Sequence, residues 1–79
     1  MTYDVLKKKR DFVAEIMEDF IRESEEMKVR AIEYKDKPAV MEHYMAAAQH
    51  KVNKASALRE AVIAMDEKLE RLLKKETDK

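Results

Sequence analysis

The chain of 79 residues contains no cysteine and no glycine, and it contains a single proline. Without cysteine, disulfides, thiolate metal sites and thiol catalysis are excluded. Without glycine, and with one proline, the sequence lacks the turn residues of multi-stranded proteins, which excludes β-sandwiches, barrels and Rossmann-type domains. The absences therefore predict an all-α protein, and the length predicts one domain spanning residues 1–79.

The sequence also lacks a dominant charge and a long apolar run. It has 17 basic and 17 acidic residues, so its formal net charge is zero although 43% of its residues are charged. Nucleic-acid-binding modules usually carry a basic excess, because phosphate contacts supply most of their non-specific affinity. No apolar run approaches the ~18 residues of a membrane span, and no cleavable apolar leader follows the N-terminal basic residues. We therefore expect a cytoplasmic protein that has no membrane partner and for which nucleic acid is a disfavoured partner.

The helical pattern is interrupted once, at the hairpin turn formed by Asp36, Lys37 and Pro38. Proline pushes the preceding residue out of the α region but is tolerated in the first turn of a helix. We therefore predict one helix over about 3–35, with Thr2 as its cap, a turn at 36–37, and a second helix over about 38–75 that Asp36 caps. The remaining residues, 76–79, are expected to fray.

Apolar residues recur at heptad spacing along both predicted helices, which indicates a coiled-coil-like antiparallel hairpin. In the first helix the spacings of three and four alternate without interruption through Tyr3, Leu6, Arg10, Val13, Met17, Phe20, Ser24, Met27, Ala31 and Tyr34. In the second helix one step near Ala55 breaks the alternation, along the series Met41, Met45, Ala48, Val52, Ala55, Leu58, Val62, Met65, Leu69 and Leu72. Such a step predicts a locally overwound supercoil. Folding about residues 36 and 37 places residue i beside residue 73 − i, so that small residues such as Ser24 and Ala48 meet.

The N-terminal tract Lys7-Lys8-Lys9-Arg10 is the main basic feature. On a helix the four side chains point in different directions, and the hairpin places them near acidic residues of the second helix, including Asp66, Glu67 and Glu70. We therefore expect ion pairing rather than nucleic-acid binding. Because Arg10 occupies a seam position, we expect it to fix the register by reaching an acid on the facing helix.

Two further groups of residues lie beside the seams, in the half of the hairpin away from the turn. They are Val5, Phe12 and Ile16 on the first helix and Ala57, Ala61 and Ala64 on the second. A two-helix layer leaves such flanks exposed to water, and an exposed apolar patch indicates an interface. We therefore predict a homodimer that forms a four-helix bundle, with a different protein as the alternative partner.

Chemistry-bearing residues are few. His43 and His50 are seven residues apart and share a helix face, but neither belongs to a Glu-x-x-His or His-Glu-x-x-His motif. We expect surface histidines, with a pH-sensitive or metal-bridged subunit contact as the alternative. Neither Ser24 nor Ser56 has a histidine one turn away, so we expect no catalytic residue, metal or cofactor.

The predicted function is therefore that of a non-catalytic helical interaction module: an adaptor, an assembly factor or a small inhibitor. Methionine is frequent, with six residues, and an adaptable methionine-rich seam that opens for a partner's helix is an alternative to a simple core. Two other functions stay open. One is a nucleic-acid-associated dimer that uses the basic tract, and the other is a structural component of a larger oligomer.

Overall fold

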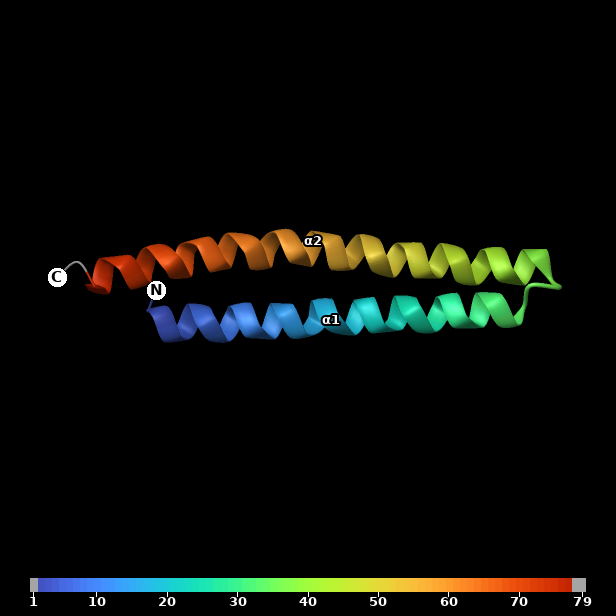
Figure 1. Cartoon of the computed structure of the whole chain (residues 1–79), viewed down its shortest axis with the longest axis horizontal. Helices are drawn as coiled ribbons and strands as arrows, with labels where there is room; N and C mark the ends of the chain where they lie inside the picture. Colours follow the sequence, from blue (N-terminus) through green and yellow to red (C-terminus); the bar gives the residue numbers. More distant parts are fainter. Residues whose placement is uncertain (1, 78–79) are drawn as a thin grey trace.

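A computed structural model describes residues 2–77, with side chains through residue 75. Two helices, α1 (Tyr3–Glu33) and α2 (Pro38–Thr77), lie side by side and run in opposite directions (Figure 1). Together they form a rod measuring 65 × 15 × 14 Å. The predicted all-α antiparallel hairpin is confirmed. No helix in this part of the chain is both long enough and apolar enough to cross a membrane.

The helix boundaries differ slightly from the predicted ones. Thr2 caps α1 as expected, since its hydroxyl accepts a hydrogen bond from the Val5 backbone N–H at 3.4 Å. The first helix ends at Glu33 rather than 35. The second continues through residues 76 and 77, which were predicted to fray. Residues 78 and 79 lie outside the described part.

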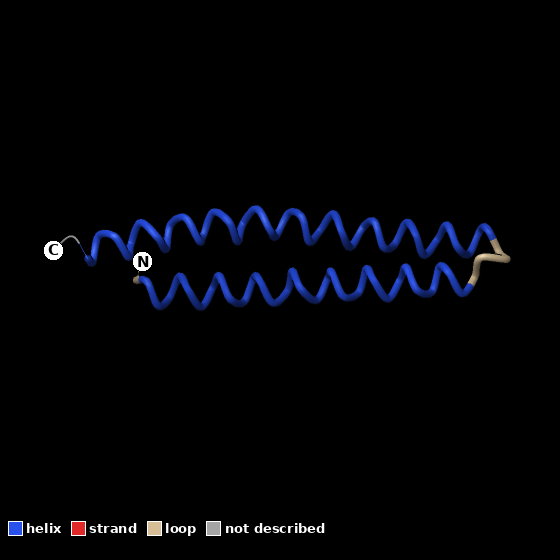
Figure 2. The backbone as a smooth tube through the Cα atoms, viewed as in Figure 1, coloured by secondary structure: helices blue, strands red, loops and turns tan. Residues whose placement is uncertain are grey.

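The connection between the helices spans residues 34–37, so it is longer than predicted (Figure 2). The Tyr34 N–H donates to the carbonyls of Arg30 and Ala31, and the Lys37 N–H donates to the Tyr34 carbonyl at 2.8 Å. No residue of the described chain has a positive φ, which explains how a sequence without glycine makes this reversal.

The second helix begins at Pro38, the position where a missing N–H costs least. The Lys37 carbonyl accepts the first helical hydrogen bond, from the Met41 N–H at 3.0 Å. This makes Lys37 the residue that precedes the helix. Within the described chain the Asp36 carboxylate forms no hydrogen bond to this helix, so the prediction that Asp36 caps it is wrong.

The core of the hairpin is a single thin seam. In α2 the buried residues fall every seven positions, at Ala48, Ala55, Val62 and Leu69. In α1 they are Leu6, Ser24 and Ala31. Since three of the six buried apolar residues are alanines, the seam buries little side-chain volume. The other predicted seam residues are mostly half-buried.

The irregular step predicted in the second helix is absent from the buried pattern. Met45 is 48% exposed, whereas Tyr44 and Lys51 are half-buried. With Tyr44 and Lys51 in the seam, the spacings of three and four alternate throughout α2. The expectation of a locally overwound supercoil therefore loses its basis.

Contacts across the seam show the register. The Tyr34 and Tyr44 rings stack with centroids 5.6 Å apart, and Lys51 Nζ lies 3.1 Å from a Glu23 carboxylate oxygen. The residue numbers in these two pairs and in the Arg10–Asp66 ion pair add up to 78, 74 and 76, all above the expected 73.

Candidate protein interface

Because the hairpin is one layer of two helices, each of its two side faces lies open. We call one the Phe12 face, defined by the six residues predicted as an interface: Val5, Phe12, Ile16, Ala57, Ala61 and Ala64. We call the other the Ile63 face, defined by exposed apolar residues on the opposite side of the seam: Ile21, Met45, Ile63 and Leu73.

The hairpin brings the six predicted residues onto one side. The ring of Phe20 lies beside the ammonium groups of Lys51 and Lys54, at 5.3 and 5.5 Å from its centroid. Ile16 is one helical turn before Phe20, and Ala57 is one turn after Lys54. At 100° per residue, the other four residues continue these two lines toward the open end of the hairpin.

The Phe12 face is exposed where its side chains are largest. Phe12 itself is 64% exposed and Val5 is 49% exposed, whereas Ile16 is half-buried. The three alanines of α2 are exposed and leave a shallow surface beside these larger residues. Phe12 and the small residues beside it form an exposed apolar surface. Removing such a surface from water by binding another protein is energetically favourable.

One ion pair and two cation–π contacts border the Phe12 face on its side toward the turn. Lys51 bridges to Glu23, and its aliphatic stem lies in the seam, so the charge reaches water while the stem is packed. Lys51 and Lys54 both hold their cations over the Phe20 ring, where the ring's electrons attract them. These contacts cover Phe20, which is half-buried as a result.

The Ile63 face contains an apolar groove that the sequence analysis did not identify. The groove has a volume of about 370 Å³ and is lined by Met17, Ile21, Val52, Ala55, Ser56 and Arg59. The exposed Met45, which was assigned to the seam, belongs to this face. The signal was present in the sequence, because Ile21, Ile63 and Leu73 are apolar residues outside the predicted seams.

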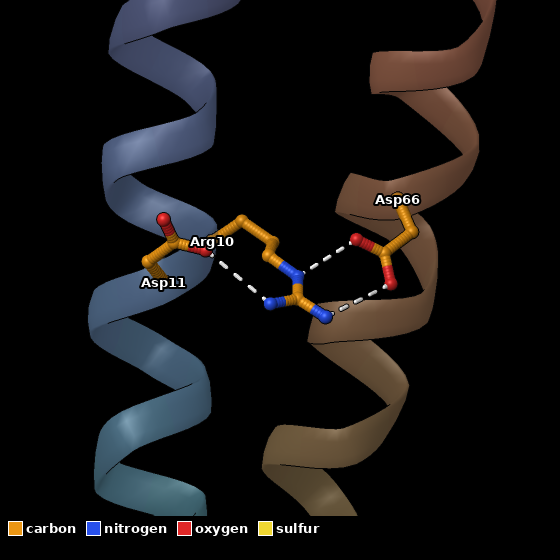
Figure 3. A network of polar contacts seen from close by, with 3 residues as sticks. All are labelled: Arg10, Asp11 and Asp66. Atoms are coloured by element: carbon orange, nitrogen blue, oxygen red, sulfur yellow. Dashed lines mark hydrogen bonds and ion pairs between the residues drawn. The ribbon is translucent and has the colours of Figure 1, made fainter.

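An ion pair joins the helices near the open end of the hairpin (Figure 3). Arg10 Nε lies 2.8 Å from Asp66 Oδ1, Nη2 lies 3.5 Å from Asp66 Oδ2, and Nη1 donates to Asp11 Oδ1 at 3.3 Å. The prediction that Arg10 reaches an acid on the facing helix is confirmed. The hydrogen bonds to Asp66 and then Asp11 raise the pKa of the Arg10 guanidinium, so Arg10 keeps its positive charge.

Of the rest of the basic tract, Lys7 faces acidic residues of α2, as expected. Lys7 and Arg10 line a cleft of about 520 Å³ whose α2 side includes Asp66, Glu67 and Glu70. Lys8 and Lys9 are exposed. The negative charges of these carboxylates repel phosphate and so offset its attraction to Lys7 and Arg10.

The candidate chemical groups occupy ordinary positions. The buried Ser24 hydroxyl donates to the Ile21 carbonyl of its own helix at 2.6 Å. Both histidines are exposed, and the His43 ring meets the Tyr44 ring edge-on at 5.7 Å. Within residues 2–77, no three His, Cys, Asp or Glu side chains are grouped as metal ligands.

Comparisons of the chain with protein-family models, with curated proteins and with solved structures found no match.

Proposed function

We propose that this chain is a non-catalytic helical interaction module that acts through the Phe12 face. The observation that carries the proposal is Phe12 itself, which is 64% exposed beside three exposed alanines on a rod with a thin core. Small domains with little buried area commonly gain stability by associating. Covering Phe12 and its neighbours adds the second layer that the hairpin lacks.

The first partner we propose is a second copy, giving a homodimeric four-helix bundle. In a two-fold dimer the same surface serves both subunits, so each apolar contact occurs twice. In this proposal the protein works in the cytoplasm as an adaptor, assembly factor or small inhibitor. It acts by binding and not by catalysing a reaction. Nucleic acid is a weaker candidate because the cleft beside Lys7 and Arg10 also contains four carboxylates.

Sedimentation velocity over a micromolar concentration range tests the proposal. We expect the wild type to be a dimer, and Phe12→Glu and Ala61→Glu to be monomers with lower helicity by circular dichroism. Phe12→Glu removes the largest exposed apolar side chain, whereas Ala61→Glu puts a carboxylate against apolar neighbours without a partner. Ile63→Glu on the opposite face is the matched control and should remain dimeric.

Each alternative gives a different result. If all three variants remain dimeric, the Phe12 face is not the self-association surface. If Ile63→Glu alone dissociates, the opposite face is the interface. A folded wild-type monomer contradicts the homodimer and leaves a different protein as the partner of the module. Species much larger than a dimer favour a structural oligomer.

A further inference from the structure

We infer that the second copy binds the Phe12 face with the two-fold axis parallel to the helices, so that both turns lie at the same end. This inference rests on the proposed homodimer and adds its orientation. In this arrangement α1 of each subunit packs against α2 of the other. The rotation leaves each residue at its own height along the rod. An α1 residue and an α2 residue that lie at the same height within one chain therefore also face each other across the dimer interface.

Side-chain size is complementary in this arrangement. Phe20 lies at the level of Lys51 and Lys54, and the helices are antiparallel, so moving eight residues back to Phe12 reaches α2 near Ala61. Phe12 therefore faces the partner subunit's Ala61, and Ile16 faces the partner subunit's Ala57. The largest exposed side chain of the face thus meets the smallest ones at the same level.

Charge is complementary in the same register. Toward the turn, the α1 edge of the Phe12 face carries four acids and one cation, Arg30; the acids are Asp19, Glu23, Glu26 and Glu33. The corresponding edge of α2 carries no acid, and its polar residues are His43, His50 and Lys54. Because Glu23 pairs with Lys51 across the seam, Glu26 lies near the level of His50. The acidic edge of each subunit therefore faces an edge of the other that carries Lys54 and no acid, which favours this docking in the half toward the turn.

The opposite orientation loses the match of side-chain size. If the two-fold axis ran perpendicular to the rods, α1 would pack against α1 and α2 against α2, with the ends reversed. In the register that overlaps the whole rod, Phe12 would then lie among the partner's acids. Lys54 would lie among the partner's alanines. Each pairing places a charge against an apolar surface without a partner.

The face is also large enough. Its outline of 65 by 15 Å gives about 1,000 Å², and stable interfaces bury roughly 800 Å² on each partner. About four-fifths of the outline must therefore be covered, which limits how far the two rods can slide. A parallel, fully overlapped dimer meets this requirement.

The absence of cysteine provides a direct test, because a single introduced cysteine is the only label site. Lys35→Cys lies in the exposed turn, and a spin label there gives one distance between subunits by double electron–electron resonance. Turns at the same end predict a separation under about 35 Å, because packed helices lie roughly 8–10 Å apart and the label arms add the remainder. The reversed dimer predicts about 60 Å, since the rod is 65 Å long. That result overturns the inference.

Charge reversal supplies a second, independent readout. Glu26→Lys should weaken the dimer roughly tenfold, because the substitution occurs twice in a two-fold interface. Adding His50→Glu in the same chain should restore most of the affinity. A double variant weaker than either single variant contradicts the pairing. Sedimentation of the labelled protein separates the two proposals: a monomer overturns the homodimer itself, whereas a dimer with distant labels overturns only its orientation.

Discussion

Replacing Leu69 by alanine should lower the free energy of unfolding by about 2–3 kcal/mol. Leu69 is 8% exposed and lies in the seam, and the substitution removes three carbon groups worth about 0.8 kcal/mol each when buried. The cavity left behind accounts for the upper end of the range. For a domain of this size the loss corresponds to a midpoint lower by about 10–20 °C.

Leu73→Ala is the matched control for this change. Leu73 is in the same helix, one turn later, but 49% of it is exposed. The same three carbon groups are therefore only half-buried, and the expected loss is about 1 kcal/mol. Both variants are compared with the wild type by thermal unfolding, followed by circular dichroism at equal protein concentration, because dimerisation makes the midpoint depend on concentration. Equal losses for the two variants would refute the heptad seam as the source of stability.

Phe20→Ala should cost about 2 kcal/mol in urea unfolding, below the ~3–5 kcal/mol of a fully buried phenylalanine, because the ring is half-buried beneath Lys51 and Lys54. A loss above about 4 kcal/mol would show that the ring is covered by more than these lysines. Asp66→Asn should lower the thermal midpoint at low salt by removing the partner of Arg10, and the difference from the wild type should shrink at 1 M salt, where charges are screened. A difference that is independent of salt would contradict an electrostatic origin.

The amino-acid sequence by itself determined the helices and the seam of α1. Its apolar positions repeat every three and four residues, and this local period is enough to say which side of a helix turns inward. The absence of glycine and the single proline limited the reversals to one. The polar seam position of Arg10 predicted its ion pair, since a charge placed there must find a partner on the facing helix.

Only the tertiary structure decided the register and the membership of the second seam. Residues 34–37 make the connection, and two of them also carry acceptable helix propensity, so the sequence pattern extended the first helix too far. Lys51 was counted as polar although its stem packs in the seam and its cation reaches Glu23. Met45 was counted as core although it faces the groove side. Long amphipathic side chains can be packed and charged at once, and which part is covered depends on the neighbouring helix rather than on the residue type.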